Sequence, residues 1–383
     1  MTITFNPSKD FLFVSPWRGV YSRSPLVPVA YAPNAEFGID QAALRQAMTA
    51  GFAQLDAPKA AKAIMAGCIP FAAMDAACLY LIDEVEYCDG EEALALLQSS
   101  SKPSAPAVNP ILSHQPLMSA SAYKEAVARA VLTIQNHELS KVVLAQAQRL
   151  TLTHPINTVG ALARLLAQNP SGYTYSVPVR ERGVFIGASP ELLVRQQGQY
   201  IECFPLAGTA VRALAPEQDQ FNADQLLSSL KNQHEHRLVV EDIVQRLAPL
   251  VTELSVSETP ELVCTSQVWH LGSKITGRLV QKGHVLDLVS LFHPTPALCG
   301  SPRDAAAAFI QVAEPFRRHY FSGAVGWCDA HGNGEWAVAI RCAEIKGHEV
   351  VVYAGAGIVA DSDPEEEWVE TMNKQKVILE AIL

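Results

Sequence analysis

Two carboxylates and one ammonium group are spaced to share a helical face near the C-terminus. Glu367, Glu370 and Lys374 stand at positions i, i+3 and i+7 of the acidic stretch that follows Pro364, and a helix would bring them onto one side. Carboxylate oxygens are the ligands that a hard cation such as Mg²⁺ prefers. The ordinary alternative is a solvated acidic first turn that complements the helix dipole. A cation site therefore requires further charged residues to converge on this face.

A stretch of small residues precedes that helix. Gly355 and Gly357 alternate with alanine after the strand expected at 349–353. We expect this stretch to be a glycine-rich loop, because residues without bulky side chains let backbone N–H groups approach an anion closely. The loop and the helix together predict a site for an anionic small molecule that is bound partly through a divalent cation.

Two charged residues in apolar surroundings are candidates for proton transfer. Lys141 begins the apolar strand expected at 141–150, where burial would lower its pKa and make it a general base. Glu191 follows a Ser-Pro pair and precedes two leucines, where burial would raise its pKa and make it a proton donor. Taken alone, Lys141 is more simply a lysine that extends to water, and Glu191 a turn-capping or ion-paired glutamate.

A further carboxylate lies in a long helix expected at about 223–247. Glu235 has Lys231 one turn before it, and an exposed ion pair between them is the default interpretation. The neighbours of Glu235, His234 and His236, fall on different helical faces. They therefore do not form the i, i+4 histidine pair of a zinc-binding helix.

Three more positions offer groups that could bind a carboxylate. Gly208 and Thr209 lie in a turn of small residues whose N–H groups and hydroxyl are available. His270 lies in an alternating strand, where a packed core histidine is the simpler interpretation. Arg341 is expected inside the strand 336–343. There, an inward guanidinium would clamp a carboxylate, and an outward one would be surface charge.

The elements that must position these residues alternate between short strands and helices. The remaining predicted elements are a helix from 121 with its apolar stripe, a helix at 157–168, strands at 172–179, 183–188, 191–195 and 200–204, strands near 262–276, helices near 285–291 and 304–312, and a hairpin at 323–345. Strands joined by hairpins and interrupted by helices favour an α+β fold. We expect one large domain with mostly antiparallel sheets and helices packed on the outside.

The chain divides into a region of weak pattern and a region that carries the chemistry. Residues 1–110 are expected to be the N-terminal part of the same fold, ending in the Ser/Pro-rich loop 98–110. Residues 111–383 contain all the candidate site residues and are expected to be the catalytic region.

Charge and composition exclude several classes of function. A net charge of −10 and a pI near 5.6 argue against binding to nucleic acid or to an anionic membrane. The first residues show neither the basic start nor the long apolar core expected of a signal peptide, and the apolar stretch 63–82 is broken by Pro70 and Asp75, so we expect no membrane span there. The eight cysteines show no CxxC pair and no zinc-ligand spacing, so we expect them to be small buried hydrophobic residues in a reducing compartment. We expect a cytoplasmic protein.

Ten motifs follow one another over roughly the last two-thirds of the chain. They are Lys141-Val-Val-Leu-Ala, Gly187-Ala-Ser-Pro-Glu191-Leu, Pro205-Leu-Ala-Gly208-Thr209-Ala, His234-Glu235-His236, Trp269-His270-Leu, His293-Pro-Thr-Pro-Ala297-Leu298, Gly326-Trp, Ile340-Arg341-Cys-Ala, Gly355-Ala-Gly-Ile and Glu367-Trp-Val-Glu370. Their order resembles the chorismate-utilising enzymes, the family of anthranilate synthase component I, and within them the isochorismate synthases that supply 2,3-dihydroxybenzoate siderophores. Ten motifs in the right order are highly specific.

This resemblance implies a Mg²⁺-dependent isomerisation of chorismate to isochorismate, in which water adds at ring C2 and the C4 hydroxyl leaves. It gives Lys141 the role of the base that activates water and Glu191 that of the acid. Glu235 and Glu370 would bind the Mg²⁺ cofactor directly, and Glu367 through water. The substrate-binding residues that it implies are Gly208, Thr209, His270, Ala297, Leu298, Arg341, Gly355, Gly357 and Lys374.

Two other functions remain open on the same residues. A salicylate synthase would go on to eliminate pyruvate, and a non-catalytic chorismate-binding protein would keep the pocket without turnover. Lys141 favours water over ammonia as the nucleophile, since family members that use ammonia commonly carry a different residue there. The expected partner is the small molecule chorismate, with no nucleic acid and no membrane. We expect a monomer that makes at most a transient contact with the next enzyme of its pathway.

Overall fold

The computed structural model describes residues 4–31, 39–101 and 109–383, and every strand pair within these ranges is antiparallel. The ten-stranded sheet runs in the order β18 (Gly300–Ser301), β8 (Lys141–Leu152), β22 (Glu349–Ile358), β21 (Cys342–Lys346), β10 (Gly183–Ser189), β9 (Tyr173–Val179), β1 (Leu12–Val14), β2 (Gly19–Ser22) and β6 (Val85–Cys88), with β7 (Ile111–Pro116) paired to β8.

Two further sheets complete the described strands. The nine-stranded sheet runs in the order β14 (Val251–Val256), β17 (Ile275–Leu279), β12 (Tyr200–Phe204), β11 (Leu192–Gln197), β20 (Gly334–Val338), β19 (Ala324–Asp329), β4 (Ile64–Ile69), β5 (Cys78–Ile82) and β3 (Val27–Val29). The small sheet runs in the order β13 (Leu206–Val211), β16 (Val268–Gly272) and β15 (Glu261–Cys264).

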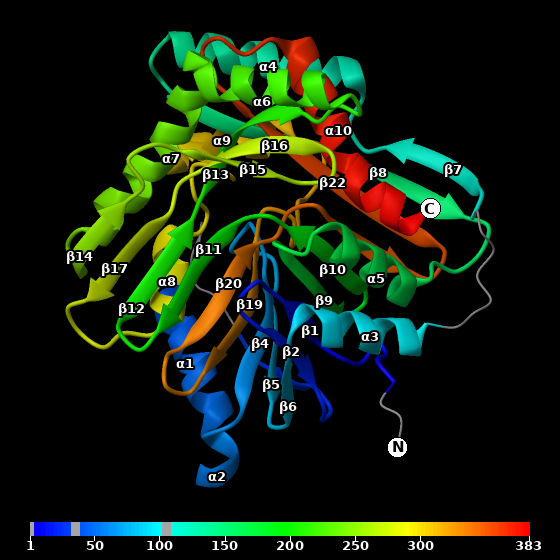
Figure 1. Cartoon of the computed structure of the whole chain (residues 1–383), viewed down its shortest axis with the longest axis vertical. Coiled ribbons are helices and arrows are strands. Elements are labelled where there is room, and N and C mark those ends of the chain that lie inside the picture. The colour runs from blue at the N-terminus through cyan, green and yellow to red at the C-terminus, as the bar shows by residue number, and fades with distance from the viewer. Residues whose placement is uncertain (1–3, 32–38, 102–108) are drawn as a thin grey trace.

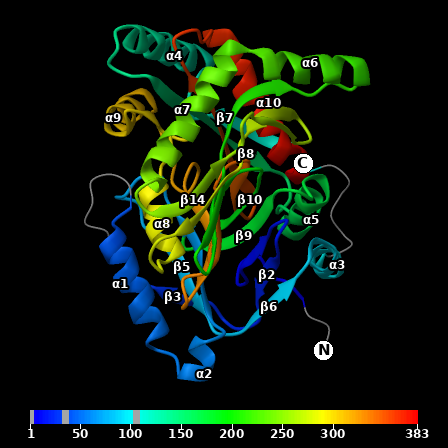
Figure 2. The ribbon, with the colours of Figure 1, turned by 60° about the vertical axis from the view of Figure 1, so that its left-hand side comes forward.

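Most of the described helices pack on the outer faces of the two large sheets, whereas α6 (Pro216–Ser228) packs against the small sheet. The described helices are α1 (Gln41–Phe52), α2 (Ala57–Ala60), α3 (Gly90–Ser100), α4 (Ala120–Gln135), α5 (Thr158–Gln168), α6, α7 (Leu230–Leu247), α8 (Val285–Phe292), α9 (Arg303–Ala313) and α10 (Pro364–Ile382). Figure 1 shows α4, α6 and α10 gathered at one end of the molecule, and α1 and α2 at the other. In Figure 2, α1 and α8 lie on one side of the strands and α3 and α5 on the opposite side.

One apolar core lies between the two large sheets. It joins Phe13 and Phe185 of the ten-stranded sheet to Tyr80 and Trp327 of the nine-stranded sheet. Separate apolar clusters lie beneath the helices on each outer face. Because apolar side chains fill both faces of each large sheet, the strands that carry the site residues are held rigidly from both sides. The expected α+β fold, with antiparallel sheets and outer helices, is confirmed.

The first hundred residues contribute to both large sheets rather than forming a separate layer. Strands β1, β2 and β6 belong to the ten-stranded sheet, and β3, β4 and β5 to the nine-stranded sheet. Of the predicted Ser/Pro-rich loop, residues 98–100 are the end of α3, and 102–108 lie outside the described residues.

The predicted single helix at about 223–247 is wrong, because the chain breaks at Ser229. Ser229 has extended backbone dihedrals and is both the last cap of α6 and the N-cap of α7. Its hydroxyl accepts a hydrogen bond from the N–H of Asn232. A serine that satisfies the first orphan amides of a helix favours a new helix start at that position.

The glycine-rich stretch is a strand, and the predicted loop is wrong. Gly355 pairs with Ala145 and Gly357 with Val143 in the ladder between β22 and β8. On the opposite edge, β21 pairs with β22 only over Glu349–Val352. The small residues therefore lie in a strand and let side chains of other elements approach its backbone closely, which is a common reason for glycine inside a strand.

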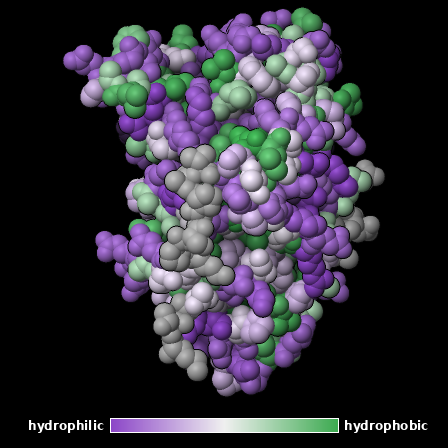
Figure 3. Space-filling view, turned by 90° about the vertical axis from the view of Figure 1, so that its right-hand side faces the viewer, coloured by the Kyte–Doolittle hydropathy of each residue, from purple (hydrophilic) through white to green (hydrophobic). Residues whose placement is uncertain are grey.

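The surface presents a mostly polar face in one view. Figure 3 shows hydrophobic side chains in small groups among hydrophilic ones on that face. Within the described ranges, no helix has both the length and the apolar character needed to cross a membrane.

Candidate active site

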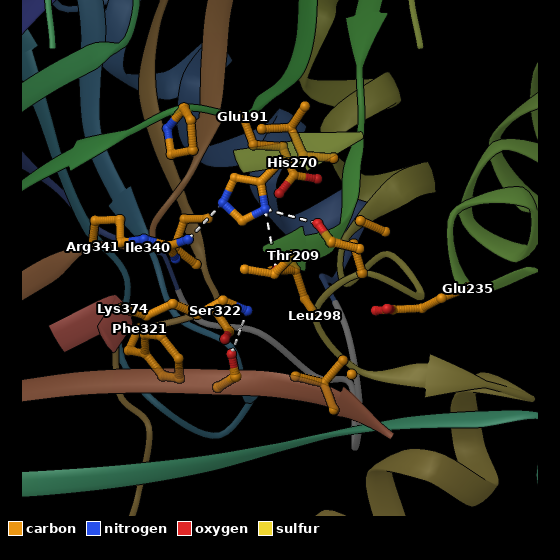
Figure 4. Close-up of a pocket in the computed structure, with 18 residues that line it drawn as sticks. Glu191, Thr209, Glu235, His270, Leu298, Phe321, Ser322, Ile340, Arg341 and Lys374 are labelled. Atoms are coloured by element: carbon orange, nitrogen blue, oxygen red, sulfur yellow. Dashed lines mark hydrogen bonds between the residues drawn. The ribbon is translucent and has the colours of Figure 1, made fainter. Parts of the chain in front are cut away.

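A cavity brings together most of the predicted site residues, and its lining comes from ten separate segments of the chain. Its lining comprises Val143, Pro190, Glu191, Leu206, Ala207, Gly208, Thr209, Glu235, His270, Ala297, Leu298, Phe321, Ser322, Ile340, Arg341, Gly355, Gly357 and Lys374. Figure 4 shows Glu191, His270 and Arg341 on one side of this cavity and Glu235 further away. Three predicted site residues, Lys141, Glu367 and Glu370, are not part of the lining.

A β-bulge on the small sheet shapes one wall. The register between β13 and β16 shifts between Ala207 and Thr209, and Gly208 has a φ of +76°. An added Cβ at Gly208 would lie 3.1 Å from the Cβ of Asn232 on α7. Glycine is favoured here because the left-handed backbone and the packed helix both disfavour a side chain. The bulge turns the Gly208 carbonyl towards His270, 3.0 Å away.

Arg341 lies where the chain crosses between the large sheets, so the predicted strand 336–343 is wrong at this point. Strand β20 ends at Val338 in the nine-stranded sheet, and β21 begins at Cys342 in the ten-stranded sheet. In the crossover, Arg341 adopts a φ of +49°, which is uncommon for a residue with a side chain. The guanidinium is buried, and its Nη2 lies 2.8 Å from Nε2 of His270. Within the hairpin predicted at 323–345, β19 and β20 do pair through a tight turn, whereas β21 belongs to the other large sheet.

The wall at Ala297 and Leu298 is tied to the strand that carries Lys141. This segment follows α8 and leads into β18, which pairs with the start of β8. Arg318, itself buried beside Glu314, donates a 2.8 Å hydrogen bond from Nη1 to the carbonyl of Leu298. Because both ends of the turn are fixed, its side chains have little freedom to move away from the cavity.

Glu191 is a buried acid whose carboxyl is suited to hold a proton near neutral pH. The residue precedes β11 and is 3% exposed. Burial raises the pKa of Glu191 to about 7, against smaller opposing effects of a hydrogen bond from the Leu206 backbone and the charges of Lys141, Arg341 and Lys374. A carboxyl with such a pKa can donate a proton at neutral pH and recover it afterwards.

Lys141 and Glu235 form a buried ion pair at the edge of the cavity. The Nζ of Lys141 lies 2.9 Å from Oε1 of Glu235. This contact is an ion pair without a hydrogen bond, because the Nζ has no hydrogen-bond partner among the described residues. Burial would raise the pKa of Glu235, but the ammonium of Lys141, together with the charges of Lys374 and Lys231, outweighs it and lowers that pKa. An added Cβ at Gly357 would lie 2.1 Å from the same Oε1 and 2.9 Å from Cε of Lys141. Gly357 therefore leaves the space that the pair occupies.

The expected ion pair between Lys231 and Glu235 is wrong. Lys231 instead reaches across to α10, where its Nζ lies 2.8 Å from Oε1 of the buried Glu367. Glu370, one turn further along α10, pairs with Lys374. Each of the three predicted metal ligands thus has its own lysine partner. The sequence spacing identified the helical face correctly, but only the tertiary fold, which brings the start of α7 within reach of β8 and α10, decides which charges meet.

The carboxylate set suits Mg²⁺ in chemistry but is not converged. Burial and the nearby charge of Glu370 raise the pKa of Glu367 to about 7, as expected where two carboxylates share a site without a cation. Glu367 and Glu370 line a second cavity, which shares Thr209 with the first. Within residues 4–31, 39–101 and 109–383, however, no three His, Cys, Asp or Glu side chains stand close enough to hold a metal ion.

Several residues that line the cavity were not anticipated. Val143 is two positions after Lys141 on β8, so strand alternation alone places it on the same face. Ile340 precedes Arg341 and shares its crossover. Phe321 and Ser322 lie in the turn before β19, and the apolar or small character of these residues gives no chemical indication. Their position is decided only by the way the two sheets face each other.

Comparisons with known proteins agree with this geometry. The family of chorismate binding enzymes matches residues 73–383. A putative isochorismate synthase of Aeromonas hydrophila is 39% identical over 362 residues, covering 93% of this chain and 89% of that protein. Isochorismate synthase EntC of Escherichia coli K12 is 35% identical over 376 residues, covering 98% of this chain and 95% of that protein.

A solved structure shares the whole fold. The putative 2,3-dihydroxybenzoate-specific isochorismate synthase DhbC of Bacillus anthracis superposes with a TM-score of 0.86 at 31% identity, covering 98% of this chain and 96% of that one. The chain therefore belongs to the chorismate-binding enzyme family, in its isochorismate synthase branch.

Proposed function

We propose that this protein converts chorismate to isochorismate in a Mg²⁺-dependent reaction. The observation that carries the proposal is the placement of a buried acid with a pKa of about 7, Glu191, in one cavity with two cations, Arg341 and Lys374. A dianionic substrate needs local positive charge in a protein of net charge −10. Arg341 and Lys374 supply part of that charge inside the cavity.

Proton transfer is assigned to two residues, Lys141 and Glu191. Lys141 is the proposed base, which takes a proton from the water that adds at C2. Glu191 is the proposed acid, which protonates the C4 hydroxyl so that it leaves as water while the double bond migrates. Because Lys141 contacts the cavity through Glu235, it acts only after its ion pair with Glu235 is loosened.

Substrate carboxylates are assigned to the cationic wall. Arg341 and Lys374 are proposed to hold the enolpyruvyl carboxylate, with Gly355 and Gly357 leaving room for it beside β22. Lys374 already donates a 3.0 Å hydrogen bond to the Gly355 carbonyl, which orients its ammonium group. Gly208, Thr209, His270, Ala297 and Leu298 are proposed to line the ring site.

The proposed metal ligands are Glu235 and Glu370 directly and Glu367 through water. Their hard oxygen donors fit Mg²⁺, and the chemistry that Mg²⁺ would supply when bound is neutralisation of the ring carboxylate. To bind it, the three carboxylates must exchange their lysine partners for the metal. Glu367 and Glu370 are already adjacent on α10.

We further propose that the product feeds a siderophore built on 2,3-dihydroxybenzoate. Support comes from the name of the Bacillus anthracis relative, which is called 2,3-dihydroxybenzoate-specific, and from a vibriobactin-specific synthase of Vibrio cholerae that is 40% identical over 260 residues. Rescue of siderophore production in a bacterial strain that lacks its own isochorismate synthase tests this role. Action as a cytoplasmic monomer stays a prediction.

The decisive experiment is incubation of the purified protein with chorismate, with and without EDTA, followed by chromatography of the products. Isochorismate in the Mg²⁺-containing sample, and none in the EDTA sample, is the expected result. Salicylate together with pyruvate would identify a salicylate synthase instead. Tight binding of chorismate in calorimetry without any product would identify a non-catalytic binding protein.

A further inference from the structure

His270 makes contacts on both ring nitrogens at the centre of the cavity wall. Its Nδ1 lies 3.0 Å from the carbonyl oxygen of Gly208 and 3.3 Å from the hydroxyl of Thr209. Its Nε2 lies 2.8 Å from Nη2 of Arg341. Figure 4 shows the imidazole ring standing between Arg341 and Thr209. The histidine thus links the bulge of the small sheet to the crossover between the large sheets.

The chemistry of these partners fixes the tautomer of the ring. A guanidinium only donates hydrogen bonds, so Nε2 must accept from Arg341 and carries no proton. A backbone carbonyl only accepts, so Nδ1 must carry the proton and donate to Gly208. The charge state agrees, because burial and the cations Arg341 and Lys374 lower the pKa of His270 well below its ordinary value. The ring is therefore neutral and protonated on Nδ1.

Arg341 depends on this single acceptor. Among the described residues, the contact with His270 is the only hydrogen bond that its side chain makes. Its Nε is buried and has no hydrogen-bond partner in the described part of the chain. A buried guanidinium with an unsatisfied N–H group is costly unless a ligand completes it. The unpaired Nε–H is therefore a donor kept free for a group that enters the cavity.

We propose that His270 is a positioning residue, which holds Arg341 through its unprotonated Nε2 so that the free side of the guanidinium meets a substrate carboxylate. This inference deepens the proposed function and rests on it, because it takes the carboxylate to be that of chorismate. His270 touches neither the attacking water nor the leaving hydroxyl in this assignment. Its removal loosens substrate binding and leaves the proton-transfer residues in place.

Two substitutions divide the functions of the two ring nitrogens. In His270→Gln, the side-chain oxygen reaches the place of Nε2 and can still accept from Arg341. In His270→Asn, the amide nitrogen reaches the place of Nδ1 and can still donate to Gly208, but nothing accepts from Arg341. We expect KM for chorismate to rise about tenfold or more in the Asn variant and less than about threefold in the Gln variant, with kcat changed less than KM in both.

A merely structural histidine gives a different result. Equal rises in KM for the two variants, or a loss confined to kcat, would overturn the positioning role. Chorismate binding measured by calorimetry in the Glu191→Gln background, which stops turnover, should show the same order of affinities. A wild-type protein that leaves chorismate unchanged would instead refute the proposed function.

The tautomer can also be read in the unaltered protein. In protein labelled with ¹⁵N-histidine, the signals that disappear in His270→Gln belong to this ring. We expect their chemical shifts to show a protonated Nδ1 and an unprotonated Nε2. The opposite tautomer, or a doubly protonated ring at neutral pH, would overturn the inference whether or not the protein turns over chorismate.

Discussion

Replacement of Glu191 by glutamine should show separately how the proton on this buried carboxyl affects turnover and how it affects the free energy of unfolding. Glutamine imitates the protonated acid in shape but cannot release a proton. Turnover of chorismate should therefore fall by about 100-fold or more, the usual range for loss of a general acid. The cavity and the fold should be kept, because the side chain is nearly the same size.

The stability of the same variant should depend on pH in a defined direction. The folded protein raises the pKa of Glu191 from 4.5 to about 7, so it favours the protonated form. The stability from this group is fully present below the unfolded pKa of 4.5 and is lost as pH rises through about 7. That loss amounts to about 3 kcal/mol in total, at about 1.4 kcal/mol per pKa unit.

The Gln variant escapes this loss. Relative to wild type, its free energy of unfolding should increase by about 1 kcal/mol between about pH 6 and about pH 8. Urea denaturation of both proteins at these two pH values measures the change. A difference that does not vary with pH would show that Glu191 titrates normally, and full turnover would remove it from the mechanism.

A matched control lies outside the cavity. Glu335 on β20 is also fully buried and accepts a 2.7 Å hydrogen bond from Ser15, and burial raises its pKa to about 7. Glu335→Gln should therefore show a similar change of stability with pH while turnover stays unchanged. Loss of turnover in this control would show that activity responds to stability rather than to the acid at Glu191.

Three further predictions concern the charged groups around the cavity. Lys141→Ala should abolish turnover and should lower the free energy of unfolding, measured in urea, by about 3 kcal/mol, because it leaves Glu235 buried without its cation. Retained activity would show that Lys141 is not the base. Gly357→Ala should reduce turnover by about tenfold or more, because its Cβ would lie 2.1 Å from Oε1 of Glu235, whereas Gly90→Ala, with nothing within 4 Å in the described structure, should not. Glu370→Ala should raise the Mg²⁺ concentration that gives half-maximal activity, and an unchanged Mg²⁺ titration would contradict its role as a ligand.

Local sequence predicted the helix at the C-terminus well. Asp363 caps α10 by accepting from the N–H groups of Glu365 and Glu366, and Pro364 occupies the first helical position. These features act within one turn of helix, so their effect can be read without the rest of the fold. The spacing of Glu367 and Glu370 on one face follows from the same local geometry.

Other features depended on which segments pack together. The glycine-rich strand reads as a loop in sequence, because glycine favours turns unless another segment approaches closely. Arg341 reads as a strand residue because nothing local marks the change of sheet at 339–341. The sequence pattern predicted Ser229 as a residue inside one long helix, whereas the structure shows it as the N-cap of a second helix.

The sequence by itself determined the fold class, the types of residue that carry the chemistry and their local spacing along strands and helices. Only the tertiary structure decided that Lys141 pairs with Glu235 and Lys231 with Glu367, that Glu191 is buried, and that His270 holds Arg341. Local spacing is fixed by backbone geometry, whereas burial and charge pairing depend on elements that are distant in sequence and come together only when the two sheets and α10 pack.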